Sequence, residues 1–287
     1  MLNKQPKLTH LVVLLGLSVF AFSTHSTASQ KDGLLKIYFF DVGQGDSIFI
    51  EAPNGNQVLI DGGPDNKVVQ ELAKVMPFYD REIDMVIVSH PHADHIAGLI
   101  EVLKRYDVRN ILEAKEFYKS PVFPVWHDAE SDENANLIEA KAGQEIDFGN
   151  EAKLTVLYPN KSYDGIYLNK PHQANVVAML TYKNFRLLLT GDMEKSVEDT
   201  LISGGLNLNA DILKIGHHGS KTSTTSGFLS AVSPEVAFIQ VGKNRYGHPA
   251  PEILKRLSSF GIKNYRTDLD GHMEVLSDGE TYEVKRY

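Results

Sequence analysis

The sequence predicts an α/β fold in which two β-sheets pack face to face and helices cover their outer faces. Two observations favour this fold. The chain divides into two halves, and each half shows several short strands followed by an alternation of strands and helices. Both halves also place polar clusters at strand ends, namely HPHADH in the first half and TGD, GHHGS and YGHP in the second. Sheets packed in this way would bring those ends together along one edge, where we expect the functional site.

The first half contains short apolar runs separated by turn residues. Strands are predicted at 34–40, 47–52 and 57–63, with the turn DVGQGD between the first two. Apolar positions at helical spacing predict a helix over 67–76, and the β-branched run at 84–89 predicts a buried strand. The amphipathic segment 96–106 predicts the helix that follows HPHADH.

Residues 115–143 show no regular period. They combine Pro121, Pro124, several aromatic residues and the acidic stretch DAESDENAN. We interpret this segment as a long surface loop, and long loops beside a scaffold often carry specificity.

Regular patterns resume in the second half. They predict strands over 153–159, 175–182, 185–192, 211–220, 236–242, 272–277 and 281–287, and helices over 194–203, 227–232 and 250–260. The chain of 287 residues is long enough for one large domain with a substantial core.

The amino-terminal residues 1–28 have the pattern of a secretory signal peptide. Lys4 and Lys7 precede the twelve-residue apolar run LVVLLGLSVFAF, and small polar residues follow it. The run is shorter than the roughly 20 residues of a membrane span, although an uncleaved anchor is the alternative. The chain contains no cysteine, which excludes a lipoprotein anchor and disulfides. We therefore expect cleavage after Ala28, export to the periplasm or medium, no membrane association afterwards, and a single domain at 29–287.

The net charge argues against one class of partner. The whole chain carries −8, and removal of residues 1–28 with their two lysines leaves 27 minus 37, or −10. We expect no stable binding of duplex nucleic acid through a broad basic face. An anionic substrate, including a phosphodiester, can still bind where metal ions supply local positive charge.

The stretch SHPHADHIAG carries the strongest chemical signal. His90 and His92 are two residues apart on extended chain, so both imidazoles point to the same side and can reach one metal ion. Asp94 and His95 follow where the chain turns into a helix and can face a second ion. Imidazole and carboxylate ligands suit zinc, and also manganese or iron. The expected cofactors are two divalent ions, with Zn²⁺ as the first choice and Mn²⁺ as the alternative.

Other polar residues at strand ends can complete such a site. Asp192 can bridge two metals, although a turn-forming aspartate is the alternative. His217 and His218 are adjacent on a predicted strand, so one is expected to bind metal while the other faces substrate. His172 can complete the first metal, and His248 is a candidate substrate contact or proton donor; for both, a loop or turn histidine is the alternative.

The motifs DVGQGDS, LIDGG, SHPHADHIAG, LTGD, LKIGHHGS and GKNRYGHP occur in this order. Together they resemble the metallo-β-lactamase fold superfamily and, more narrowly, the hydrolase domain of ComEC/Rec2-type competence proteins. The resemblance covers about 34–287. It implies an αββα sandwich of two mixed β-sheets with helices on the outer faces. Bacterial phosphorylcholine esterases share this fold and the double-histidine motif.

By position, the resemblance also implies roles for individual residues. One metal would be bound by His90, His92 and His172, the other by Asp94, His95 and His218, and Asp192 would bridge them. The substrate's phosphate would face His217. Asp61 would orient the ligands, and Asp41 would lie close to the site. Two departures stand out. Many ComEC-type domains have a polar residue such as asparagine where His172 stands. Members of that family also carry channel-forming membrane segments, and we expect no channel role from this chain itself.

The sequence therefore predicts an exported binuclear metal-dependent hydrolase, first of all a phosphodiesterase that uses a hydroxide shared between the metals. The expected catalytic residues are Asp94, Asp192, His217 and His248. The loops that bear the site also carry Lys221, Lys243 and Arg245. These cations indicate an anionic substrate, including single-stranded DNA, with ordinary surface cations as the alternative.

Other functions stay open at this point. A phosphorylcholine-type substrate would need an aromatic cage for its quaternary ammonium, and the candidates are Phe117, Tyr118, Phe123, Trp126, Tyr163 and Tyr167. Hydrolysis of another ester or of a lactam is a weaker reading, because true lactamases lack a carboxylate that bridges the metals. A non-catalytic metal-binding recognition protein is the alternative of another class, and the full ligand set argues against it.

Overall fold

The computed structural model describes residues 19–21 and 33–287. The candidate signal peptide lies outside the described residues except for strand β1 (Val19–Ala21), which pairs in parallel with β11. Among the described residues, no helix has the length and apolar character needed to cross a bilayer.

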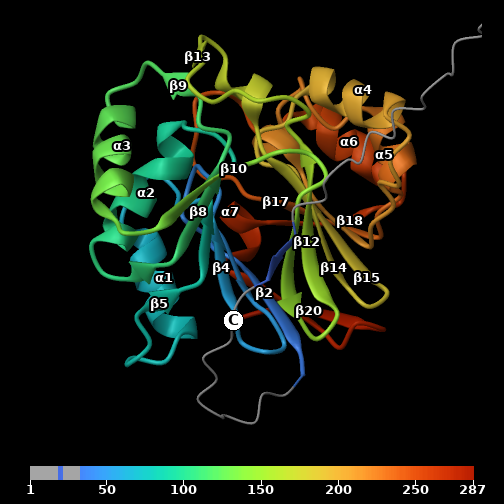
Figure 1. Ribbon diagram of the computed structural model, residues 1–287. Helices are drawn as coiled ribbons and strands as arrows, with labels where there is room; N and C mark the ends of the chain where they lie inside the picture. Colours follow the sequence, from blue (N-terminus) through green and yellow to red (C-terminus); the bar gives the residue numbers. More distant parts are fainter. Residues whose placement is uncertain (1–18, 22–32) are drawn as a thin grey trace, which may run out of the picture.

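Two eight-stranded mixed sheets form the centre of the molecule (Figure 1). The first has the order β10 (Asn136–Glu139), β8 (Asn110–Glu113), β6 (Met85–Ile87), β4 (Gln57–Ile60), β3 (Ile48–Glu51), β2 (Leu35–Phe39), β19 (Met273–Ser277) and β20 (Tyr282–Arg286). The second has the order β1, β11 (Glu145–Gly149), β12 (Ala152–Tyr158), β14 (Val177–Tyr182), β15 (Phe185–Leu189), β16 (Ile212–Lys214), β17 (Val236–Ile239) and β18 (Lys263–Arg266). The first sheet has parallel pairs at its β10 end and antiparallel pairs at its β20 end. In the second, antiparallel pairs lie between parallel pairs at both ends, so both sheets are mixed as expected.

Helices cover the two outer faces (Figure 1). The first sheet is covered by α1 (Lys67–Val75), α2 (Ala93–Leu103) and α3 (Phe123–Asp132), and the second by α4 (Lys195–Ser203), α5 (Ser226–Val232) and α6 (Pro251–Ser259). A short helix, α7 (Thr267–Asp270), follows β18. The predicted αββα sandwich is therefore confirmed.

Three apolar layers hold this arrangement together. The central layer lies between the sheets, where the rings of Phe39 and Phe238 stack with centroids 4.0 Å apart. A second layer lies between the first sheet and α1–α3, and a third between the second sheet and α4–α6. Burial of apolar surface in these layers is the main favourable contribution to folding, and it holds the sheet edges that carry the polar clusters in fixed positions.

The interpretation of residues 115–143 as a surface loop is wrong. The segment contains strand β9 (Phe117–Tyr118), helix α3 and strand β10, which extends the first sheet beside β8. Pro124 occupies the first turn of α3, where its missing N–H is tolerated. Trp126 is 1% exposed and belongs to the apolar layer beneath α2. Acidic residues occupy much of the rest of the helix, so the sequence of this segment does not show a clear helical pattern of apolar residues.

Glu116 lies between β8 and β9 and is 5% exposed, and its Oε1 has no hydrogen-bond partner within the described residues. Burial raises its pKa from 4.5 to about 8. The folded protein therefore binds more protons than the unfolded chain between these values, so this group's contribution to stability is full below about pH 4.5 and is lost as the pH rises through 8.

We expect Glu116→Gln to raise the free energy of unfolding at pH 8.5 by about 1–3 kcal/mol, because the amide stays neutral. At pH 5 the two proteins should have nearly the same stability. Urea unfolding at both pH values measures this, with the exposed Glu252→Gln on α6 as the matched control. An equal effect of Glu116→Gln at both pH values would contradict the raised pKa.

Candidate metal centre

Seven histidine and aspartate side chains meet where strands of both sheets end. His90, His92, Asp94 and His95 follow β6 and enter α2, and Asp192 follows β15. His218 lies in the 3₁₀ turn η2 (Gly216–Gly219) after β16, and His172 lies in η1 (Pro171–Ala174) before β14. Segments separated by more than a hundred residues thus converge at one edge of the sandwich, as the polar clusters predicted.

The first group consists of His90, His92, His172 and Asp192. The His92 Nδ1 atom lies 2.9 Å from Nε2 of His90 and 3.2 Å from Nε2 of His172. The Asp192 Oδ2 atom lies 3.7 Å from Nε2 of both His90 and His172. Ligands about 2.0–2.1 Å from a tetrahedral zinc ion are about 3.3 Å apart, so these four atoms have the spacing of a ligand set.

The second group consists of Asp94, His95 and His218. The His218 Nε2 atom lies 3.3 Å from Oδ2 of Asp94 and 3.4 Å from Oδ1 of Asp192. The His95 Nε2 atom lies 3.5 Å from Oδ2 of Asp192. Asp192 therefore stands between the two groups and offers an oxygen to each.

Unsatisfied buried atoms show that divalent ions fit these groups. His95 Nε2, His218 Nε2 and Asp192 Oδ1 are buried and have no hydrogen-bond partner within residues 19–21 and 33–287. Buried polar atoms are nearly always paired, because an unpaired one costs free energy. A divalent ion beside these atoms would satisfy all three, and these His and Asp groups could hold such ions.

Hydrogen bonds orient the ligands from behind. Asp61, which follows β4, accepts at Oδ2 from Ser89 Oγ at 2.6 Å and contacts His95 Nδ1 at 2.8 Å. The Nδ1 atom of His218 lies 2.8 Å from the carbonyl oxygen of Gln240. These contacts direct the Nε2 atoms of His95 and His218 towards the centre, as outer partners of metal-binding histidines commonly do.

The two aspartates of the turn DVGQGD, Asp41 and Asp46, have different contacts. Asp41 accepts at Oδ1 from the backbone N–H of Gly43 and belongs to none of the groups of possible metal ligands. Its expected place close to the site stays a prediction, whereas Asp46 contacts a member of the second group, with its Oδ1 3.3 Å from Nδ1 of His218. Gly45 makes this approach possible: it has φ +148°, and a Cβ atom there would lie 2.2 Å from the carbonyl oxygen of Asp94.

Lys214 is a buried cation that sequence reasoning missed. It is 1% exposed and forms an ion pair with Asp46, and its Nζ also donates to the carbonyl oxygen of Gly191 at 3.0 Å. The sequence contained a signal for it, namely a lysine inside the apolar strand DILKIG. A lysine buried in such a strand needs a partner of opposite charge. Burial opposes ionisation of Asp46, but Lys214 and His218 hold its pKa below the usual range.

Glu194 was also missed. Its Oε1 lies 3.7 Å from Nδ1 of His172 and 3.5 Å from Nδ1 of His217, and it accepts a hydrogen bond from Thr222 Oγ1 at 3.0 Å. It is therefore placed to orient the rings of both histidines. In this orientation the Nε2 atoms of His172 and His217 lie 3.7 and 3.8 Å from Oδ2 of Asp192.

The predicted strand position of His217 and His218 is wrong. Strand β16 ends at Lys214, and both histidines have positive φ values, 49° and 51°, in the turn that follows. The turn nevertheless places the two side chains in different surroundings. His218 is 2% exposed and belongs to the second group, whereas the His217 side chain is 21% exposed and lies at the open side of the centre.

The protonation of the centre follows from burial and charge. Burial lowers the pKa of His92 and of His217 to about 4, so both are neutral at pH 7. Burial also opposes protonation of His218, but the carboxylates of Asp192 and Asp46 raise its pKa to about 10. The pKa of Asp94 lies below its usual range despite burial, because the imidazoles of His218, 3.3 Å away, and of His95 favour its charged form. The concentrated carboxylate charge suits divalent cations.

The remaining candidates lie around the open side. His248 is half-buried, and its ring centroid lies 5.4 Å from that of His217. Lys221, Lys243 and Arg245 are exposed, and no ion pair involving them occurs among the described residues. Of the aromatic candidates, Tyr118 contacts the His92 ring at 5.1 Å, whereas Trp126 and Tyr163 are buried.

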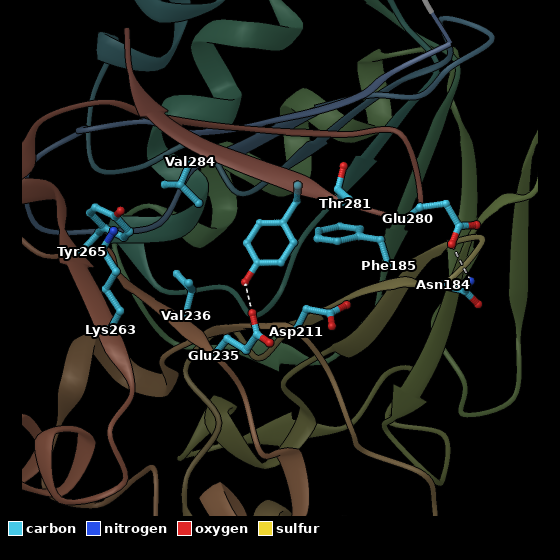
Figure 2. A pocket seen from close by; sticks show the side chains of 11 residues that line it. Asn184, Phe185, Asp211, Glu235, Val236, Lys263, Tyr265, Glu280, Thr281 and Val284 are labelled. Atoms are coloured by element: carbon cyan, nitrogen blue, oxygen red, sulfur yellow. Dashed lines mark hydrogen bonds between the residues drawn. The ribbon is translucent and has the colours of Figure 1, made fainter.

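A hollow of about 560 Å³ lies away from these ligands (Figure 2). Phe185, Val236 and Lys263 begin strands β15, β17 and β18, so the hollow lies at the opposite strand ends. Its Glu235 accepts from Tyr282 Oη at 2.9 Å and its Glu280 accepts from Asn184 at 2.8 Å. Since these carboxylates already have partners, the metal centre is the stronger functional candidate.

The family model for the Metallo-beta-lactamase superfamily matches residues 40–243, a range that contains both ligand groups. The chain belongs to the metallo-beta-lactamase superfamily. Divalent metals are commonly bound by proteins of this fold, and in this member the two groups that meet at Asp192 could hold them.

Two relatives within this superfamily are similar along most of the chain. Identity is 30% to ComE operon protein 3 of Bacillus subtilis (83% of this chain, 32% of the relative) and 31% to competence protein ComA of Neisseria gonorrhoeae (88% of this chain, 34% of the relative). The chain thus spans about a third of the length of these curated relatives. The expected resemblance to ComEC-type proteins is confirmed.

Solved structures support the fold. The metallo-beta-lactamase fold protein YhfI of Bacillus subtilis superposes with a TM-score of 0.54 at 13% identity, covering 84% of this chain and 99% of that protein. The diiron beta-hydroxylase CmlA of Streptomyces venezuelae superposes with a TM-score of 0.52 at 12% identity, covering 88% of this chain and 54% of that protein. Because the superfamily fold includes that hydroxylase, the reaction must be argued from the site.

Proposed function

We propose that this chain is an exported two-metal phosphodiesterase. The observation that carries the proposal is Asp192, whose carboxylate oxygens lie within 3.7 Å of Nε2 atoms of both ligand groups at a partly open edge of the sandwich. His90, His92 and His172 would hold one ion, and Asp94, His95 and His218 the other. When bound, two divalent ions, Zn²⁺ first and Mn²⁺ as the alternative, would supply an activated water and neutralise developing negative charge.

The protein's own side chains would orient the substrate and handle protons. His217, neutral at pH 7, lies at the open side and would contact the substrate's phosphate. The Nδ1 atom of His248 is buried and has no hydrogen-bond partner in the described part of the chain. Since its ring adjoins that of His217, His248 is placed to pass a proton to the leaving group.

The charge distribution supports an anionic substrate. The chain carries −8 overall, yet Lys221, Lys243 and Arg245 are exposed on the loops next to His217 and His248. Cations concentrated at an otherwise acidic protein's site attract an anion. Relatives named for competence and recombination favour a nucleic-acid phosphodiester. The net charge of −8 favours a single strand or a smaller diester over a stable duplex complex.

The alternatives receive less support. A phosphorylcholine substrate needs a cage of aromatic rings, but two of the six candidates, Trp126 and Tyr163, are 1% and 5% exposed. A lactam substrate has no specific contact in its favour. A non-catalytic metal-binding role would use the same ligand set and orienting contacts, so turnover in the substrate panel decides between the two roles. The proposed active form is the domain 29–287 after removal of the signal peptide, in the periplasm or outside the cell.

A substrate panel tests the proposal. It comprises bis-p-nitrophenyl phosphate, a single-stranded oligodeoxynucleotide, p-nitrophenyl phosphorylcholine and a chromogenic cephalosporin. We expect hydrolysis of the first two, loss of activity after chelation, and recovery with Zn²⁺ or Mn²⁺. Turnover of the cephalosporin alone, or of the phosphorylcholine ester alone, would contradict it.

A further inference from the structure

A continuous row of six aromatic rings crosses the open side of the metal centre. Successive ring centroids are 4.5–5.7 Å apart, and the row has the order Tyr118, His92, His172, His217, His248, Tyr246. The four histidines in the middle belong to the centre already described. The two tyrosines at the ends have no part in holding a metal.

Tyr246 is fixed in place although its side chain is exposed. It is 76% exposed, and its ring centroid lies 5.7 Å from that of His248. Asn244 accepts at Oδ1 from the backbone N–H groups of Tyr246 and His248, and its Nδ2 donates to the carbonyl oxygens of Gly242 and His248. A loop held by four hydrogen bonds thus presents a large aromatic ring to solvent, between the exposed Arg245 and the centre.

Tyr118 occupies the other end of the row. It lies in β9, which pairs in parallel with β13 (Tyr167–Leu168) as a separate two-stranded sheet at the top of Figure 1. Its ring is half-buried against His92 at 5.1 Å. The neighbouring Lys119 is exposed, so each tyrosine has a cation beside it in the chain.

We propose that Tyr118 and Tyr246 are specificity-determining residues that stack on planar groups to either side of the scissile phosphate, so that the substrate is a nucleic-acid single strand lying along the row of rings. This inference rests on the proposed phosphodiesterase function and adds to it. Aromatic side chains that stack on unpaired bases, together with cations that follow the backbone, are the means by which proteins bind single strands without sequence preference.

The separation of the tyrosines decides between two ligands that favour aromatic rings. A quaternary ammonium needs several rings around one point. Four histidine rings stand between Tyr118 and Tyr246 in the row, and in the described part of the chain no ring contact joins the two tyrosines. A row in this order offers one tyrosine ring at each end, which suits planar groups on both sides of a phosphate better than a cage around one cation.

The test compares two diesters and five proteins, namely the unaltered protein, three variants and one control variant, all loaded with metal. The substrates are a fluorescently labelled oligothymidylate and methyl p-nitrophenyl phosphate, which lacks bases. The variants are Tyr246→Ala, Tyr246→Phe and Tyr118→Ala. The control is Tyr79→Ala, because Tyr79 is 75% exposed and precedes β5 (Glu82–Ile83) and the start of β6, at the strand ends opposite the centre. Fluorescence anisotropy gives Kd for the oligothymidylate, and kinetics give kcat and KM.

We expect Tyr246→Ala and Tyr118→Ala each to raise the Kd and KM for oligothymidylate roughly 5- to 100-fold. The kcat/KM of the small diester should fall much less in these two variants, so the ratio of kcat/KM for oligothymidylate to that for the small diester declines. In Tyr246→Phe and Tyr79→Ala this ratio should stay unchanged.

Two results would overturn the inference while the phosphodiesterase function stands. One is hydrolysis of the small diester with no binding of the oligothymidylate. The other is an unchanged Kd and KM for the strand in both alanine variants. If the unaltered protein hydrolyses neither diester, the proposed function fails and the inference fails with it.

Discussion

Replacing Asp192 by asparagine is expected to lower kcat/KM for a phosphodiester by at least about 100- to 1000-fold. The carboxylate faces both ligand groups, with Oδ2 3.7 Å from His90 Nε2 and Oδ1 3.4 Å from His218 Nε2. An amide offers one neutral oxygen in place of two charged ones, so it would hold divalent ions at this position less strongly. The expected metal content therefore falls below two ions per chain.

The fold should survive this change, because asparagine has nearly the same volume and the backbone N–H of residue 192 keeps its bond to Asn175 Oδ1. The matched control is Asp199→Asn, which alters an exposed carboxylate on α4 paired with Lys195. Circular dichroism, metal analysis and steady-state kinetics are needed for both. Full activity in Asp192→Asn would remove the bridging role.

Lys214→Met is expected to lower the free energy of unfolding by about 3–5 kcal/mol. The methionine retains most of the side-chain volume, but it leaves the carboxylate of Asp46 buried without its cation. It also removes the hydrogen bond to Gly191, the residue before Asp192. For a protein of this size the melting temperature should fall by roughly 10 °C.

Two further variants separate the ion pair from general packing. Lys195→Met breaks an exposed ion pair, with side chains 63% and 57% exposed, and should cost about 0–1 kcal/mol. The double variant Asp46→Asn/Lys214→Met removes both charges and should recover part of the loss. Equal destabilisation by Lys195→Met and Lys214→Met, or no recovery in the double variant, would contradict a buried pair beneath the centre.

The sequence predicted most of the ligand groups because the signals are local. The spacing of His90 and His92 places both rings on one side of an extended segment, and Asp192 follows an unbroken apolar strand. The two-sheet architecture was also predictable, since the strands have regular apolar patterns and end in polar clusters. In each case, neighbours along the chain carried the information.

Features that depend on tertiary contacts were not predicted. Asp46 and Lys214 are 168 positions apart in numbering, and only the packed sandwich joins them. Glu194 contacts two histidines, His172 and His217, that come from other segments of the chain. Helix α3 was missed because its acidic surface masks the burial of Trp126, and the turn at His217 was missed because its positive φ has no clear sequence signal.

Metal content tests the two-metal centre most directly. The measurement is elemental analysis of the purified domain 29–287 after exhaustive dialysis, with Asp192→Asn beside it. We expect close to two transition-metal ions per chain in the unaltered protein and fewer in the variant. A natively folded protein that hydrolyses a phosphodiester without bound metal, or that keeps two ions after Asp192→Asn, would contradict the account.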